Sequence, residues 1–343
     1  MKQSDNQRAK LRASRRTILK AALGTAFAGA AGLGATALWL RPAQEQQGQG
    51  LREFAAADLA FGTTISLKVL HADEATARNA MQAALAAVRD IDRLMSLYRA
   101  DSEISRLNRD GRLAYPDPRV LAVLQHAQAL SQQTNGAFDV TVQPLWDAAA
   151  AGRDTHAELG RIGWRKLTVD AGQIAFHAPA MAVTLNGVAQ GYGVDVALSA
   201  LRQHGITDAL LDTGEFASLG QRDDGQPWTL AVRDPRDEAA YARVLVADGR
   251  CMATSGDYET RFNDDFSKHH IVDPATGDSP RELASVTVLA PTGLQADGLS
   301  TAMMVLGRQA SLDLAARTPG VDIFCIGKDG ARHATPGFPA DLA

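Results

Sequence analysis

The stretch Ala296-Asp297-Gly298-Leu299-Ser300-Thr301-Ala302 places an acidic and a hydroxyl residue at the start of an apolar run, which predicts a helix over about 294–306. Asp297 and Thr301 are four residues apart and therefore lie on one face of that helix, where a carboxylate and a hydroxyl can share one hard cation. An acid near a helix start also serves simply as a cap or as a partner of the helix dipole. On its own, the stretch leaves both interpretations open.

A second informative stretch lies upstream: Val183-Thr184-Leu185-Asn186-Gly187-Val188-Ala189-Gln190-Gly191-Tyr192-Gly193-Val194-Asp195. Its pattern predicts a strand at 181–185, a glycine turn and then a helix near 191–204. Glycines let backbone amides and carbonyls approach a phosphate or its metal, and a helix start favours an anion. The spacing fits neither a Walker loop nor a dinucleotide fingerprint, so a purely structural turn is the alternative.

Two further segments combine small hydroxyl residues, glycine and histidine. They are Ala253-Thr254-Ser255-Gly256-Asp257-Tyr258 and His269-His270-Ile271-Val272-Asp273-Pro274-Ala275-Thr276-Gly277. The first suits close phosphate contact, and a histidine with a pKa near neutrality suits proton transfer. Paired histidines also raise the possibility of zinc. Adjacent ligands project differently, however, and no third ligand stands at a familiar spacing, which disfavours a zinc site.

Outward from these segments, the apolar periodicity predicts an α+β fold: a mixed β-sheet core with flanking helices, in two tightly packed lobes. Strands outnumber helices and do not alternate regularly with them, which disfavours a doubly wound parallel sheet. Asp117-Pro118 and Asn135-Gly136 mark the start and end of one helix, Pro118 to about Thr134. The other expected elements are helices at 74–97 and 308–317 and strands at 63–70, 166–170, 173–177, 208–212, 228–233, 243–247, 285–290 and 321–326.

The first 41 residues have the layout of an export signal. Arg15 and Arg16 precede an uncharged run rich in Ala and Gly, from Ala21 to Leu40, which is similar to a twin-arginine signal. A membrane-spanning anchor is the alternative, because twenty apolar residues can cross a bilayer. We therefore predict a twin-arginine signal peptide at 1–41, a linker at 42–58 and a folded domain at 59–343, located in the periplasm and tethered to the inner membrane if the signal is not cleaved.

The charge and the cysteines limit the function classes. Beyond residue 41, 27 Lys and Arg face 38 Asp and Glu, a formal charge of −11 that disfavours nucleic acid as a partner. At 343 residues and 45% hydrophobic composition, the chain can bury a sizeable core. Its two cysteines, Cys251 and Cys325, lack metal-ligand spacing, and two buried thiols are favoured over a disulfide.

Taken together, these segments resemble the ApbE family of FAD:protein FMN transferases over about 61–307. Each motif is unremarkable alone, whereas all of them in this order are hard to obtain by chance. The resemblance rests on Phe61-Gly62-Thr63, Met95 to Asn108, Gly136-Ala137-Phe138-Asp139, Asn186 to Asp195, Thr254 to Tyr258, His270 to Gly277 and Asp297 to Thr301.

The resemblance implies a reaction and a set of site residues. It implies Mg²⁺ held by the Asp297 carboxylate, the Thr301 hydroxyl and a backbone carbonyl near Gly187. FAD is the implied substrate, and its FMN half is attached covalently to a Thr or Ser of an acceptor flavoprotein with release of AMP. His270 is the candidate general base, with Asp257 in reserve. The implied FAD contacts are Phe61, Tyr98, Ala137, Phe138, Asp139, Thr184, Gln190 and Ile271.

The chain departs from the family pattern at two places. Many members have Asp-Leu-Gly-Gly-x-Ala-Lys-Gly where this chain has Thr184 to Gly191, so an acid and the lysine at position Gln190 are absent. Glu215 stands near a common Gly-Gly-Asp. These departures and the export signal look like the NosX-type branch, whose expected acceptor is the membrane flavoprotein NosR. Two alternatives stay open: an FAD pyrophosphatase, and a non-catalytic periplasmic flavin-binding accessory protein.

Overall fold

The computed structural model describes residues 38–39 and 50–342, and its centre is a nine-stranded sheet in the order β1-β2-β3-β7-β8-β11-β12-β13-β14. Every pairing in this sheet is antiparallel, so the sheet contains no parallel pair of strands. The strands are β1 (Leu38–Trp39), β2 (Arg52–Ala60), β3 (Thr63–His71), β7 (Asp208–Asp212), β8 (Phe216–Leu219), β11 (Cys251–Gly256), β12 (Leu283–Ala290), β13 (Asp322–Gly327) and β14 (Arg332–Ala334).

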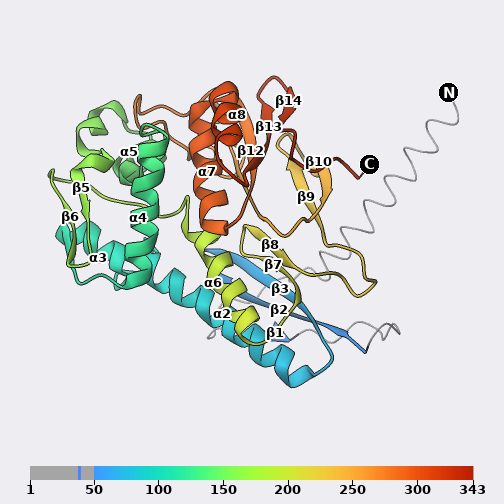
Figure 1. Cartoon of the computed structure of the whole chain (residues 1–343). Coiled ribbons are helices and arrows are strands. Elements are labelled where there is room, and N and C mark those ends of the chain that lie inside the picture. Colours follow the sequence, from blue (N-terminus) through green and yellow to red (C-terminus); the bar gives the residue numbers. More distant parts are fainter. Residues whose placement is uncertain (1–37, 40–49, 343) are drawn as a thin grey trace, which may run out of the picture.

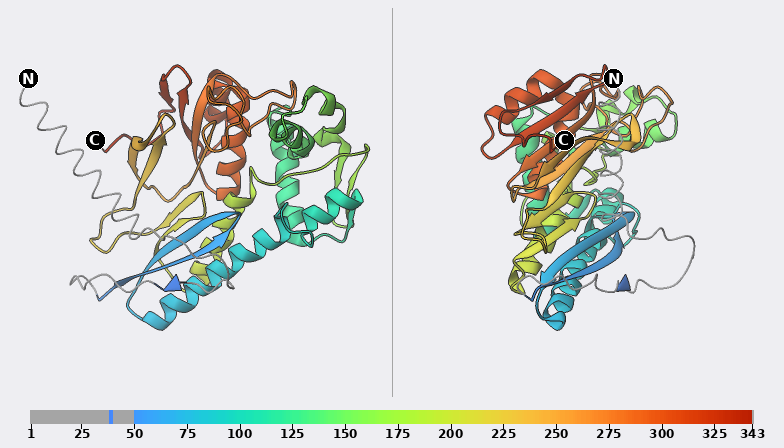
Figure 2. Two further views of the ribbon diagram at one scale, coloured as in Figure 1. Left: turned by 180° about the vertical axis from the view of Figure 1, so that it is seen from behind. Right: turned by 90° about the vertical axis from the view of Figure 1, so that its right-hand side faces the viewer.

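Helices cover one face of the sheet (Figures 1 and 2). They are α2 (Glu74–Met95), α6 (Ala189–Gln203), α7 (Gly293–Leu306) and α8 (Arg308–Ala316). In α2 the buried positions recur at helical spacing, from Ala77 through Met81 and Leu85 to Val88. All eight residues of β12 are buried, because a hairpin of β9 (Thr229–Asp234) and β10 (Asp237–Val246) covers the opposite face.

The second lobe is smaller and lies beside the end of α7 (Figure 1). It holds α3 (Glu103–Asp110), α4 (Pro118–Gln133), α5 (Gln143–Ala150) and a three-stranded sheet of β4 (Arg112–Ala114), β6 (Gln173–Phe176) and β5 (Leu167–Val169). Three short 3₁₀ helices complete it: η1 (Val140–Val142), η2 (His156–Arg161) and η3 (Trp164–Lys166). Helix α4 begins as predicted, with the Asp117 side chain accepting from the Arg119 amide and Pro118 in the first turn.

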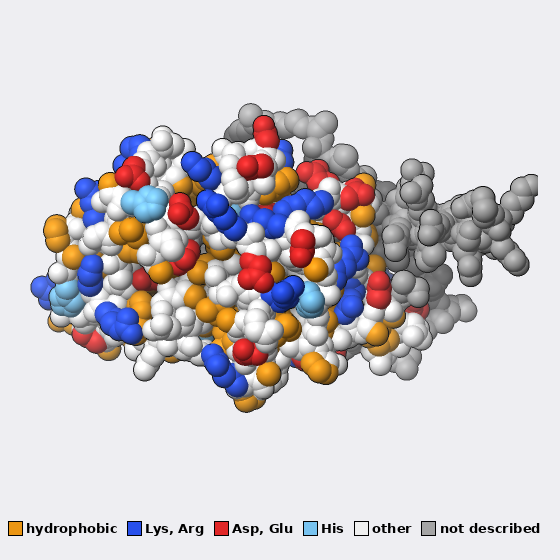
Figure 3. All heavy atoms as spheres, turned by 90° about the horizontal axis from the view of Figure 1, so that it is seen from above, with side chains coloured by type: hydrophobic (Ala, Val, Ile, Leu, Met, Phe, Trp, Pro, Cys, Tyr) orange, Lys and Arg blue, Asp and Glu red, His pale blue; other side chains and the backbone are white. Residues whose placement is uncertain are grey.

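One hydrophobic core runs through both lobes. The same buried cluster contains Ile65 and Val88 of the large lobe and Leu107, Leu124 and Ile174 of the small lobe. The two lobes are therefore tightly packed, as the sequence predicted, and the fold class is α+β. From above, acidic and basic side chains are interspersed over the surface, and apolar side chains gather near the middle of the face (Figure 3).

Two predictions about secondary structure are wrong. The predicted linker 42–58 includes most of β2, a full partner of β3 from Arg52 to Ala60. The predicted strand 181–185 joins no sheet: the Val183 amide and carbonyl bond to the Asn108 side chain, and the Thr184 amide donates to the Val140 carbonyl. Side-chain and loop partners there replace a strand ladder.

The predicted signal peptide, residues 1–41, lies outside the described residues apart from 38–39. Within the part of the chain that the structure describes, no helix is long and apolar enough to cross a membrane. Cys251 and Cys325 are both buried free thiols, as predicted.

Candidate active site

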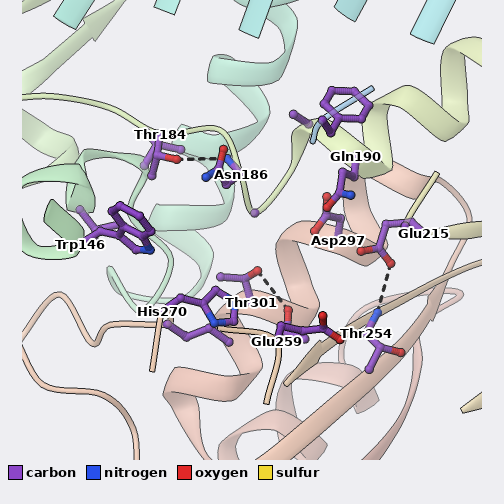
Figure 4. Close-up of a pocket in the computed structure, with 18 of the residues that line it drawn as sticks. Trp146, Thr184, Asn186, Gln190, Glu215, Thr254, Glu259, His270, Asp297 and Thr301 are labelled. Atoms are coloured by element: carbon purple, nitrogen blue, oxygen red, sulfur yellow. Dashed lines mark hydrogen bonds between the residues drawn. The ribbon is translucent and has the colours of Figure 1, made fainter. Parts of the chain in front are cut away.

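A cleft of about 610 Å³ lies where the two lobes meet, and side chains from both lobes line it (Figure 4). This volume is typical of sites for small molecules and cofactors. The structure brings all but one of the predicted site residues to this cleft: Phe61, Tyr98, Ala137, Phe138, Asp139, Thr184, Gly187, Gln190, His270, Ile271, Asp297 and Thr301. Segments separated by more than two hundred residues therefore form one site.

The glycine turn and the acidic helix start are in direct contact. The Gly191 amide donates a hydrogen bond of 2.9 Å to Asp297 Oδ2. A Cβ at Gly191 would overlap the Gly293 carbonyl oxygen and lie 2.6 Å from the Asp297 Cβ, so only glycine allows α6 and α7 to approach this closely. The Asp195 carboxylate accepts from the amides of Gly293 and Leu294 at 2.7 and 2.9 Å and so fixes the first turn of α7.

Two buried carboxylates, Asp297 and Glu215, lie close together in the cleft (Figure 4). Burial raises the pKa of Asp297 to about 7, and burial together with the neighbouring Asp297 raises the pKa of Glu215 well above its usual value. Glu215 Oε2 accepts from the Thr254 amide at 3.2 Å. Among the ion pairs of the described residues, none joins either carboxylate to Lys, Arg or His. Neither carboxylate thus has a cationic partner, because the arginine that lines the cleft, Arg233, pairs with Glu259 at 3.7 Å.

The surrounding donors are oxygens. Thr301 Oγ1 would lie 3.0 Å from a Cβ placed on Gly187, so the glycine turn passes directly over that hydroxyl. Ser255 Oγ lies 2.7 Å from Ser300 Oγ and 3.3 Å from Thr301 Oγ1. Within the described part of the chain, no group of three or more His, Cys, Asp and Glu side chains is arranged to hold a metal. A cation here would depend on carboxylate, hydroxyl and carbonyl oxygens, a donor set that fits a hard ion such as Mg²⁺.

Gln190 is bound to the turn between β7 and β8. Its Nε2 donates to the Thr213 carbonyl at 3.1 Å, and Thr213 Oγ1 donates back to the Gln190 carbonyl at 3.1 Å. This turn has a positive φ at Gly214, where the Gln190 side chain occupies the space that a Cβ would need. The neutral side chain at this departure from the family pattern thus fixes the turn that carries Glu215.

His270 lines the cleft from the loop that connects β11 and β12. Its Nδ1 lies 3.3 Å from the Thr260 carbonyl oxygen, which can only accept, so we assign the proton to Nδ1 and the lone pair to Nε2. Burial lowers the pKa of His270. The ring is therefore neutral at physiological pH, with one nitrogen free to accept a proton.

Asp257 is not in the cleft, contrary to its predicted place as a reserve base. Its side chain is fully buried and forms a two-pronged ion pair with Arg236 at 2.7 and 2.8 Å, with Lys328 at 3.4 Å. A carboxylate held in this way and shielded from the cleft cannot take a proton from a substrate there. The structure assigns Asp257 to anchoring the loop that carries His270.

Three other predicted site residues differ in their burial and hydrogen bonding. Asp139 lines the cleft, but its carboxylate accepts from the amides of Thr141 and Trp164, both at 2.8 Å, so it also stabilises the local turn. Tyr98 is 82% exposed at the rim, with a free ring face. Phe138 lines the cleft and is buried in the core that the two lobes share.

Sequence reasoning missed several cleft residues. Glu215 was noticed only as a departure from a pattern, and Trp146 of α5 carried no signal because an aromatic residue on a helix is ordinarily core. The ring of Trp146 faces the cleft and contacts Phe262 edge to face, with 6.4 Å between centroids. Further polar residues of the lining outside the predicted set include Asn186, Asp212, Arg233 and Glu259.

Comparison with known proteins decides the family. The ApbE family model matches residues 61–325, most of the chain. This chain belongs to the ApbE family. It is 33% identical over 282 residues to the FAD:protein FMN transferase of Haemophilus influenzae, covering 75% of this chain and 82% of that protein. It is 34% identical over 266 residues to the FAD:protein FMN transferase of Salmonella typhimurium, covering 71% and 75%.

Comparison with solved structures supports the same family. The flavin transferase ApbE of Vibrio cholerae superimposes with a TM-score of 0.71 at 28% identity, covering 89% of this chain and 99% of that one. The predictions of an ApbE-family chain, of its fold class and of a transferase are confirmed by these similarities. The assignment of individual residues within this ApbE-family site stays a prediction.

Proposed function

We propose that this ApbE-family chain is an FAD:protein FMN transferase that moves FMN from FAD to a Thr or Ser hydroxyl of an acceptor flavoprotein and releases AMP. The observation that carries the proposal is the placement of two kinds of group in one cleft. Asp297, Glu215 and Thr301 offer oxygen donors without a counter-ion, and His270 offers a free imidazole nitrogen. The names of the relatives support the substrate, FAD, and the protein acceptor.

In the proposed reaction, the acceptor hydroxyl attacks the phosphorus on the FMN side of the FAD diphosphate. An oxygen–phosphorus bond forms to the acceptor, the bridging phosphorus–oxygen bond breaks, and AMP leaves. His270 Nε2 takes the hydroxyl proton, and the Nδ1 contact with the Thr260 carbonyl keeps the ring oriented. Gly187 lines the cleft without a side chain, so the backbone of the turn can approach the diphosphate at this point.

Asp297, Thr301, the backbone carbonyl of the turn near Gly187 and, beside them, Glu215 would hold Mg²⁺ in this cleft. When bound, a hard divalent cation neutralises the diphosphate and stabilises charge in phosphoryl transfer. The side chains are already oriented for this purpose, because the Gly191 amide fixes Asp297 and the Thr254 amide fixes Glu215.

The test uses the purified chain lacking residues 1–41, FAD, Mg²⁺ and an acceptor domain, with free AMP and the acceptor mass as readouts. AMP together with FMN bound to the acceptor supports the transferase. AMP with free FMN supports an FAD pyrophosphatase instead, and tightly bound flavin without AMP supports the accessory-protein alternative. Only the first outcome is compatible with our proposal.

We also propose that the protein works in the periplasm after twin-arginine export and that its acceptor is a membrane flavoprotein, with NosR as the first candidate. The paired Arg15 and Arg16 before an uncharged run support export. Fusing residues 1–58 to a reporter that is active only after folded export tests this, with Arg15→Lys and Arg16→Lys together as the control. Export unchanged by that double substitution would refute the twin-arginine route.

A further inference from the structure

The paired histidines His269 and His270 differ in their surroundings. His269 forms an isolated β-bridge with Arg261, and His270 follows it at a bend. His270 lines the cleft, whereas His269 is fully buried beneath it and is not part of the lining. The two rings are 6.4 Å apart between centroids and inclined at 68°. The proposed reaction uses only the second of them.

His269 is bonded at three points to one short segment. Its amide donates to Ser279 Oγ at 2.9 Å, and Ser279 Oγ donates back to the His269 carbonyl at 2.8 Å. Its ring nitrogen Nε2 lies 3.1 Å from the Pro280 carbonyl oxygen and therefore carries the proton. On the other side, the His270 amide donates to the Thr260 carbonyl at 2.9 Å. The segment that carries both histidines is thus held between two neighbouring stretches of the loop.

The other ring nitrogen of His269 has no partner. His269 Nδ1 is buried and makes no hydrogen bond, an arrangement that costs stability. Burial lowers the pKa of His269 to about 4, and the charges of Lys328, Asp257 and His270 have smaller effects on it, so the ring is neutral. An apolar side chain would avoid the cost of the unpaired nitrogen. The contact through Nε2 is what an apolar side chain could not supply.

We propose that His269 is a positioning residue: its bond to the Pro280 carbonyl holds the segment in the register that points His270 into the cleft. This rests on the proposed role of His270 in transfer. Loss of the bond leaves the Pro280 carbonyl without its partner and lets the segment rotate. The Nδ1 contact of His270 with Thr260, at 3.3 Å already near the limit of a hydrogen bond, is then lost first.

Two substitutions of similar size separate this role from simple packing. In His269→Gln the amide nitrogen reaches the position of Nε2 and keeps the bond to Pro280. In His269→Asn it reaches only the position of Nδ1, where the structure offers no acceptor. We expect the Gln variant to keep the transfer kcat within about threefold. We expect the Asn variant to lose about 10- to 100-fold in kcat, as misplaced catalytic groups do, with the KM for FAD nearly unchanged.

The second readout does not depend on transfer. Long-range ¹H–¹⁵N spectra of imidazole-labelled protein report which nitrogen of His270 carries the proton. The wild type and the Gln variant should show the proton on Nδ1, and the Asn variant a mixture of both forms. Equal kcat values in the two variants, or an Asn variant that loses kcat while the His270 spectrum stays wild-type, would overturn the inference. A wild type without transfer but with the expected spectra would instead overturn the proposed function alone.

Discussion

The acidic wall of the cleft and its histidine wall are held by different kinds of structure. Asp297 lies in α7, which is packed against α6, β11 and β12, and Glu215 directly precedes β8. His270 lies in the long connection between β11 and β12, held by loop hydrogen bonds and by the buried Asp257–Arg236 pair. The acidic wall is thus part of the core, whereas the histidine wall depends on a few polar contacts. Binding of the diphosphate and proton transfer should therefore respond differently to mutation.

The largest effect is expected at the acidic wall. Asp297→Asn keeps the shape and the neighbouring Gly191 amide but removes the negative charge, and we expect AMP release to fall by about 10³-fold or more. The measurement is chromatographic quantification of AMP over a range of Mg²⁺ concentrations. Asp313→Asn, at an exposed position on α8, is the matched control and should be silent. A normal rate in Asp297→Asn would eliminate this carboxylate from the site.

At the histidine wall, His270→Ala should slow transfer by about 10²- to 10⁴-fold while FAD binding changes little. Flavin fluorescence measures binding, and single-turnover labelling of the acceptor measures the rate. In the wild type, burial lowers the pKa of His270 below its usual 6.5, and the neutral ring is the active form. The contribution of His270 to the rate, measured as the ratio of wild type to His270→Ala, should therefore be constant near pH 7 and fall as the pH drops through that lowered pKa. A rate that rises on acidification would exclude a neutral imidazole base.

The contact between α6 and α7 gives a third test, on stability. Gly191→Ala would drive a methyl group into the Gly293 carbonyl and the Asp297 side chain, at a cost of about 1–3 kcal/mol or more. Urea denaturation measures the free energy of unfolding. Gly160→Ala is the control, because no atom lies within 4 Å of the added methyl group. If the two variants were equally stable, α6 and α7 could move apart to admit the methyl group. The close contact that fixes Asp297 would then not be rigid.

The smallest expected effect is on stability and tests whether the Glu215 and Asp297 carboxylates repel each other. Burial and Asp297 raise the pKa of Glu215 above its unfolded value of about 4.3, so the folded state binds this proton more tightly, and stability falls as the pH rises through the raised folded pKa. With metal ions removed by EDTA, Glu215→Gln should be more stable than the wild type by about 1 kcal/mol at pH 8, and the gain should shrink towards pH 5. A gain independent of pH would show that charge repulsion is not its cause.

Much of the site could be predicted because its residues sit in local motifs. Helix α4 has start and stop signals at Asp117-Pro118 and Asn135-Gly136, and the helix carrying Asp297 and Thr301 shows its polar face in the sequence. The glycine turn was predicted to approach a phosphate or its metal, and that stays a prediction. At Gly191 the structure gives a different reason for glycine, because the adjacent helix leaves no room for a side chain.

The rest depended on partners far away in sequence. The segment of β2, rich in alanine, has weak strand propensity and becomes a strand through its pairing with β3. Residues 181–185 have the apolar pattern of a strand, but Asn108, more than seventy residues away, takes the backbone bonds of Val183. Glu215 and Asp257 are both acids near glycines. Only the fold puts the first in the cleft and the second against Arg236.

The single core shared by the two lobes has a consequence for how substrates enter. Lobes that share buried side chains such as Ile65, Val88 and Leu124 cannot swing apart as independent bodies without exposing them to water. The two sides of the cleft therefore keep a fixed relative position, and heating should unfold both lobes in one calorimetric transition. FAD and the acceptor must enter and leave through movements of side chains and of the loop that carries His270.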